Sequence, residues 1–120
     1  MQMKVLAQGP DLVKVCVAGR IDQSQFQPEV EPLEQILGPE VYQRQVLLDL
    51  HGVELLDSCG VGWLLKCHRR FRDRGGSLVL HSLAPMVANV LRILRMDHVL
   101  QTAGTEAEAV RRAQESRPLS

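Results

Sequence analysis

Three consecutive residues near the middle of the chain, Ser58, Cys59 and Gly60, place a hydroxyl and a thiol in a short turn. A largely apolar stretch at 46–57, which ends in Asp57, precedes them, and a helical pattern follows them over 61–74. Backbone N–H groups and the dipole at the start of a helix favour negative charge. The turn therefore suits a phosphate group or a thiolate, and the residue types alone leave both chemistries open.

Other residue types that support chemistry are scattered. The histidines occupy separate segments without metal-ligand spacing, at His51, His68, His81 and His98. The cysteines are odd in number and match no zinc pattern, at Cys16, Cys59 and Cys67. We therefore expect no metal site, and a reduced chain in the cytoplasm. A dyad of Cys59 with a histidine stays open. Without paired carboxylates or a phosphate-cradling glycine loop, however, we expect neither an enzyme nor a cofactor.

The 120 residues suffice for one domain with its own core. The formal net charge is +0 and 3% of the residues are aromatic. A neutral chain with so few rings is not expected to bind nucleic acid or an anionic membrane. No apolar run approaches the roughly 18 residues of a membrane helix, and the stretch after Lys4 is too short for a signal peptide. We therefore expect no membrane insertion.

Short apolar segments bounded by turn residues predict five strands. They cover 4–7, 12–18, 46–50, 78–80 and 99–100. The turn residues Gly9-Pro10-Asp11 join the first two as an antiparallel hairpin. The continuous apolar run at 46–50 is typical of a strand that is covered on both faces.

Apolar residues at helical spacing predict helices over 28–37, 61–74, 85–94 and 105–114. The apolar stripe of the first comprises Val30, Leu33, Ile36 and Leu37. Gly38 and Gly75 end the first two helices, Pro85 begins the third, and Thr105 with Glu108 forms a capping box at the fourth.

Strands and helices alternate, so the fold class is α/β, with a mostly parallel sheet and an antiparallel N-terminal edge. We assign residues 1–114 to one domain and expect the tail, 115–120, to be frayed.

Several segments together carry a resemblance to a known family. They are LDL at 48–50, LDSCGVG at 56–62, RGGSLVL at 74–80, GRID at 19–22, and VxxVL…MD between 87 and 97. Over roughly residues 3–113 they resemble the STAS domain of bacterial anti-sigma-factor antagonists. The resemblance implies a four- to five-stranded sheet with about four helices largely on one side. It also implies partner switching, in which the protein binds a serine-kinase anti-sigma factor when unphosphorylated and releases it when phosphorylated.

The resemblance also assigns roles around the central turn. The family's phosphoacceptor lies just before the first glycine of the D-S-x-G-x-G block, which here is Cys59. The implied partner-binding surface comprises the two acids and the start of the following helix: Asp22, Asp57, Ser58, Cys59, Gly60, Val61 and Gly62. Each of the two acids also has a purely structural explanation as an alternative to partner binding. Asp57 suits a helix N-terminus, and Asp22 suits the cap of a turn.

Cys59 departs from the family pattern, which has serine or threonine at this position. A protein kinase transfers phosphate to a hydroxyl oxygen, and the larger, softer sulfur is a poor acceptor. We therefore expect a constitutive binder that is not switched at Cys59. Phosphate on Ser58 is an alternative, although we expect the Ser58 hydroxyl to cap the helix.

Two further alternatives do not need phosphorylation. One is a redox sensor, because a helix N-terminus favours the Cys59 thiolate. The other is a STAS subunit of an ABC-type lipid-transport complex.

Two features of the predicted helix at 61–74 have both a structural and a functional explanation. The basic stretch Lys66–Arg74 is expected to meet the negative end of the helix dipole and to solvate the exposed face, with contact to an acidic partner as the alternative. Trp63 is expected in the core, with an exposed interface anchor as the alternative. Nothing in the sequence indicates an oligomeric state.

Overall fold

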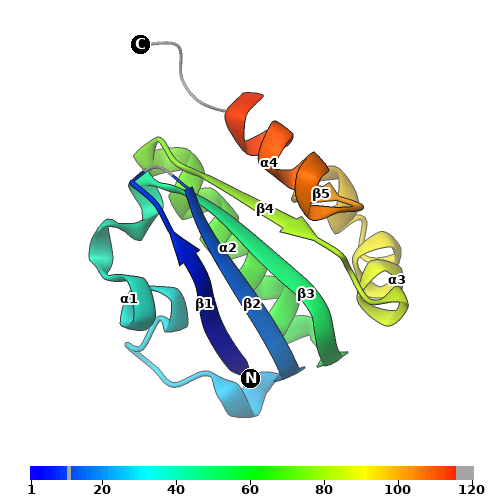
Figure 1. The fold of residues 1–120 in the computed structure, drawn as a ribbon. Coiled ribbons are helices and arrows are strands. Elements are labelled where there is room, and N and C mark those ends of the chain that lie inside the picture. Colours follow the sequence, from blue (N-terminus) through cyan, green and yellow to red (C-terminus); the bar gives the residue numbers. More distant parts are fainter. Residues whose placement is uncertain (11, 116–120) are drawn as a thin grey trace.

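A computed structural model describes residues 1–10 and 12–115, which form a five-stranded sheet with strand order β1-β2-β3-β4-β5 (Figure 1). The strands are β1 (Gln2–Gln8), β2 (Leu12–Ile21), β3 (Gln45–Leu56), β4 (Ser77–His81) and β5 (Gln101–Ala103). β1 is antiparallel to β2, and the other neighbouring strands are parallel. The predicted mostly parallel sheet with an antiparallel N-terminal edge is confirmed.

Within the described residues, three α-helices and three short 3₁₀ helices lie between the strands, and a fourth α-helix follows β5. They are η1 (Gln23–Gln25), α1 (Pro32–Leu37), η2 (Pro39–Gln43), α2 (Ser58–Arg74), α3 (Pro85–Ile93), η3 (Met96–His98) and α4 (Glu106–Glu115). Figure 1 shows α2 behind the sheet and α4 on its near side. The buried side chains of α1, α2 and α3 belong to the larger core cluster, so the helices lie largely on one side, as predicted.

The two faces of β3 explain why its apolar run is continuous. Val46 and Leu48 face the larger core together with Leu64 and Phe71 of α2. Leu47 belongs to a second cluster, which it forms with Val79, Ala103, Ala109 and Ala113. The strand is therefore buried on both faces over 46–50, as its sequence predicted.

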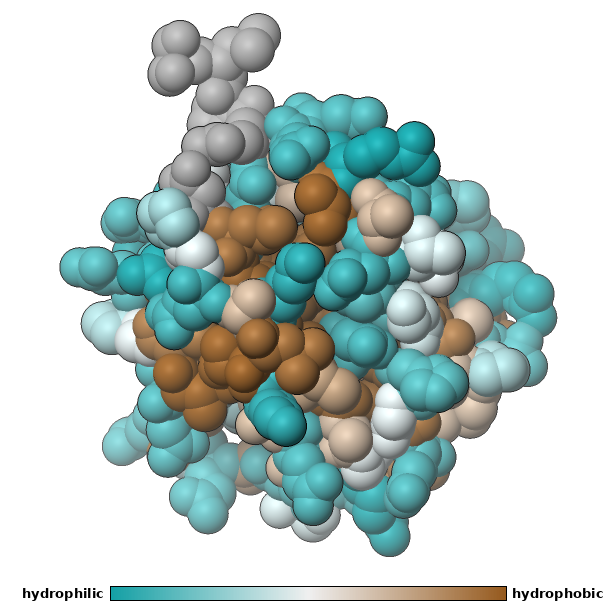
Figure 2. Space-filling model, in the orientation of Figure 1, coloured by the Kyte–Doolittle hydropathy of each residue, from teal (hydrophilic) through white to brown (hydrophobic). Residues whose placement is uncertain are grey.

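On the side shown in Figure 2, apolar surface gathers over β1 and β2, and Leu6 of β1 is 52% exposed.

The first helix is shorter than predicted. It begins at Pro32 rather than residue 28, because Glu31 is in the extended conformation that a following proline favours and caps the helix with its side chain. Glu29 has a positive φ of 68°. As a result, Leu33 and Leu37 are buried, whereas Val30 and Ile36 of the predicted stripe are each 41% exposed.

The prediction of the last strand at residues 99–100 was wrong. Residues 99–100 follow η3, and the N–H groups of Val99 and Leu100 both donate to the carbonyl of Met96, so they are not free to pair with β4. The strand starts at Gln101 instead.

At the C-terminus α4 ends at Glu115, one residue beyond the predicted end of the last helix. The predictions for Asp11 and 116–120 lie outside the described residues. In the described ranges, no helix is long and apolar enough to cross a membrane.

Candidate functional site

Asp57 is the N-cap of α2. Its Oδ1 accepts a hydrogen bond from the backbone N–H of Gly60 at 2.9 Å. The carboxylate thereby satisfies a donor that the first turn leaves free, and its charge matches the positive end of the dipole. The prediction that the Ser58 hydroxyl caps this helix was wrong, because Ser58 is already the first helical residue. The Ser58 side chain is exposed instead.

The ends of β2 and β3 bring the two predicted acids to one edge of the sheet. Ile21 and Leu56 are partners in the parallel register, so Asp22 and Asp57 follow side by side. Asp57 donates its N–H to the carbonyl of Ile21 at 3.3 Å, and its Oδ2 accepts from the N–H of Gln23 at 3.1 Å. Asp57 therefore ties the start of α2 to the chain that leaves β2.

Asp22 has a similar structural role at the start of η1. Its Oδ1 accepts from the N–H of Ser24 at 3.1 Å and from the Ser24 hydroxyl at 2.5 Å, which caps η1. Its Oδ2 accepts from Nε of Arg20 at 2.9 Å. The Ser24 hydroxyl and then Arg20 hold the pKa of Asp22 below its usual value, against the opposing effect of burial. Both structural explanations offered for the acids are thus observed.

The predicted partner-binding residues divide by exposure. Ser58, Cys59 and Gly62 are exposed, Asp57 is half-buried, and the remaining three, Asp22, Gly60 and Val61, are buried. Of the predicted surface, the small residues at the start of α2 are therefore the ones that are open to solvent. The acids, Gly60 and Val61 shape that surface from beneath.

A groove that the sequence did not indicate opens beside the turn, with a volume of 460 Å³. We call it the α2 groove. One wall is the segment 26–34, and the other is the face of α2 that carries Cys59, Gly62, Trp63, Lys66 and Arg70. The missed signal is the spacing of these five residues, which places them along one side of a helix.

Glu31 holds the two walls of this groove together, and sequence reasoning missed its role. Its carboxylate accepts from the N–H of Glu34 at 3.0 Å, from the Tyr42 hydroxyl at 3.3 Å and from the indole Nε1 of Trp63. The thiol of Cys67 also donates to it, at 3.6 Å. Trp63 is 7% exposed, which confirms its prediction as a core residue.

The three cysteines have different environments, and all are free thiols. Cys59 is exposed, and Cys16 is half-buried on β2. Cys67 is buried, and burial, followed by the Glu31 carboxylate, raises the pKa of its thiol. Cys67 is therefore a poor nucleophile, whereas Cys59 is open to reagents.

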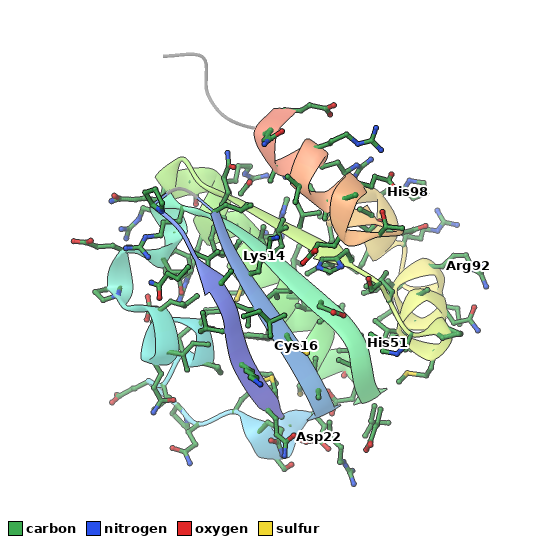
Figure 3. All side chains as sticks on the ribbon, viewed as in Figure 1. Lys14, Cys16, Asp22, His51, Arg92 and His98 are labelled. Atoms are coloured by element: carbon green, nitrogen blue, oxygen red, sulfur yellow. The ribbon has the colours of Figure 1, made fainter. Side chains whose placement is uncertain are left out.

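The side-chain view shows the remaining candidate residues to be dispersed. His51 comes from β3 and His98 from η3, and Asp22 lies at the opposite end of β2 from Lys14 (Figure 3). Within 1–10 and 12–115, no three His, Cys, Asp or Glu residues are grouped so that they could hold a metal ion. Arg72 and Arg74 of the basic stretch lie in the last turn of α2, where the dipole favours them.

Comparison with solved structures gives the same architecture. A protein from Thermotoga maritima, described as a "putative anti-sigma factor antagonist", has a TM-score of 0.77 and 19% identity, over 94% of this chain and 93% of that chain. An anti-sigma-factor antagonist (STAS) domain protein from Planctomyces limnophilus has a TM-score of 0.63 and 25% identity, over 93% and 97%. The Bacillus cell fate determinant SpoIIAA in its phosphorylated form has a TM-score of 0.63 and 20% identity, over 92% and 98%.

A family model described as "Mlab, STAS domain" matches residues 6–102. This span contains the whole of β2, β3 and β4, the Asp57-capped turn and the whole of α2. The resemblance predicted from the sequence is thereby confirmed, and the chain belongs to the STAS domain family.

Proposed function

We propose that this STAS domain acts as an anti-sigma-factor antagonist-like protein. It binds a serine-kinase anti-sigma factor through the turn Asp57-Ser58-Cys59-Gly60, and it has no catalytic activity of its own. The observation that carries this proposal is the exposure of small residues, Ser58, Cys59 and Gly62, at a helix start that Asp57 holds in place. Small side chains allow a partner backbone to approach closely.

The chemistry of Cys59 sets how this binding is regulated. SpoIIAA, which shares the fold, has been solved in a phosphorylated form. A phosphate group brings roughly two negative charges and disrupts a packed interface when it is added there. At Cys59, the position that the family resemblance assigns to the phosphoacceptor, this chain offers a thiol, which is a poor acceptor for a serine kinase. We therefore propose that binding is constitutive with respect to phosphorylation at Cys59.

Isothermal titration with a serine-kinase anti-sigma factor from the same organism tests the docking surface. Ser58→Arg adds a long, charged side chain at an exposed position and should weaken binding by about tenfold or more. Asp73→Arg is the matched control, because it introduces the same side chain at an exposed position near the other end of α2. Equal affinity of wild type and Ser58→Arg would move the interface elsewhere.

A second candidate is a STAS subunit of an ABC-type lipid-transport complex. The thiol of Cys59 favours it, because such a subunit requires no phosphoacceptor at this position. Co-purification with an ATPase encoded beside the gene, and retention of that complex in the absence of any kinase, distinguishes it from the first candidate.

A further inference from the structure

The α2 groove has an apolar floor that is held rigidly. The Trp63 ring packs against Phe26 with centroids 5.6 Å apart, and Pro28 and Pro32 line the facing wall. The Glu31 carboxylate beneath them is already occupied by donors from Trp63, Tyr42, Cys67 and the backbone of Glu34. It is not available to a ligand, so the floor presents rings and proline carbons.

Charged side chains line the rims of the groove, and they differ in whether they already have a partner. Arg70 is engaged, since it donates to the Tyr42 hydroxyl at 3.1 Å and lies 4.0 Å from the carboxylate of Glu34. Lys66 is exposed, and within 1–10 and 12–115 no carboxylate lies within ion-pair distance of it. Glu29 is exposed on the opposite rim. An ammonium group beside an apolar floor is complementary to an apolar side chain with a carboxylate next to it.

The groove is open where it meets the docking turn. A Cβ atom built on Gly62 has no neighbour within 4 Å, and Cys59 lines the same groove one helical turn earlier. The volume of 460 Å³ lies within the range of protein pockets that bind ligands. A partner segment that docks at Cys59 can therefore continue into the groove.

We propose that the α2 groove receives an apolar side chain of the docked partner segment, and that a carboxylate beside this side chain pairs with Lys66. This inference rests on the proposed function, because the same anti-sigma factor is the occupant. It adds the chemistry that the partner must present: a bulky apolar anchor packed against Trp63 and Phe26, and an acid beside Lys66. Buried anchors of this kind carry most of the affinity of protein interfaces.

The test uses a substitution that fills the groove from within. Gly62→Leu places a side chain in open space on a helix, so the fold should stay intact while the groove is occupied. Arg69→Leu is the matched control, because residue 69 is exposed on the same helix and does not line the groove. Titration with the anti-sigma factor should show about tenfold or greater weakening for Gly62→Leu and little change for Arg69→Leu.

A small probe tests the same site without the partner. N-acetyl-phenylalanyl-glutamate amide should quench or shift the fluorescence of Trp63, the only tryptophan of the chain. The glutamine analogue should bind more weakly, and Lys66→Glu should remove the difference between the two while Lys66→Arg keeps it. No response of Trp63 at millimolar concentrations, or equal responses in wild type and Gly62→Leu, would overturn the proposal.

The outcomes separate this inference from the proposed function. If Ser58→Arg weakens partner binding and Gly62→Leu does not, docking at the turn stands and the groove is not used. If neither substitution weakens binding, the docking surface itself is wrong.

Discussion

Two glycines on the same turn of α2 give opposite predictions. A Cβ atom added to Gly60 would lie 2.4 Å from the carbonyl oxygen of Ile21 and 2.7 Å from Cδ1 of Leu56. A Cβ atom added to Gly62, two residues on, meets nothing within 4 Å. Gly60→Ala should therefore force α2 away from the end of β2, whereas Gly62→Ala should leave the structure as it is.

The magnitudes follow from these contacts. Overpacking costs about 1–3 kcal/mol, and a clash with a backbone oxygen belongs at the upper end because that oxygen cannot move aside alone. Replacing glycine by alanine within a helix regains up to about 1 kcal/mol. The net expectation is about 2 kcal/mol of destabilisation for Gly60→Ala and up to about 1 kcal/mol of stabilisation for Gly62→Ala. For a domain of this size, the melting temperatures should differ by about 10 °C.

Urea unfolding followed by Trp63 fluorescence and by far-UV circular dichroism measures both free energies on the same helix. Wild type should lie between the two variants. Equal midpoints for Gly60→Ala and Gly62→Ala would refute the close approach of α2 to Ile21, and with it the geometry of the docking turn.

Three further predictions concern the polar groups of the site. Asp57→Ala should lower the free energy of unfolding by about 1–3 kcal/mol in urea titrations, because two backbone N–H groups lose their acceptor; a change within error would contradict the capping role. The pKa of Asp22 is lowered in the folded protein, so the stabilisation that its carboxylate provides is complete above the ordinary value of 3.8 and is lost as the pH falls through the folded value. The stability difference between wild type and Asp22→Asn should accordingly shrink in urea titrations below about pH 4, and a constant difference would count against these hydrogen bonds. Iodoacetamide with mass spectrometry should label Cys59 before Cys67 in the folded protein and all thiols in urea, whereas equal labelling in the folded protein would show that Cys67 is accessible.

The architecture was accessible from the sequence because burial in the core imposes regular apolar patterns on its strands and helices. The run at 46–50 and the helical spacing from Val61 to Phe71 are both set by burial, and the structure buries them as expected. The segment 28–37 misled the prediction because its apolar spacing fits a helix while Pro32 stops that helix from extending backwards. The restriction that Pro32 places on the backbone of Glu31 therefore determines where the helix begins, in spite of the apolar spacing.

The site was accessible only in part. Asp57 and Ser58 are both good capping residues, and sequence spacing does not decide which of them takes the N–H of Gly60. The parallel register of Ile21 with Leu56 decides it, because that pairing positions Asp57 at the end of β3. The sequence did not reveal the Glu31 network, because its donors lie as many as 36 residues from Glu31 and meet it only after packing. These donors are Glu34, Tyr42, Trp63 and Cys67.

We propose above that this STAS domain binds its partner at the α2 turn without a phosphorylation switch at Cys59. Intact-mass spectrometry after incubation with the cognate serine kinase and ATP tests it most directly, with Cys59→Ser as the comparison. Wild type should gain no phosphate and stay bound to the kinase, whereas Cys59→Ser should be phosphorylated and released. Stoichiometric phosphate on wild-type Ser58 or Cys59, with loss of the complex, would contradict the account.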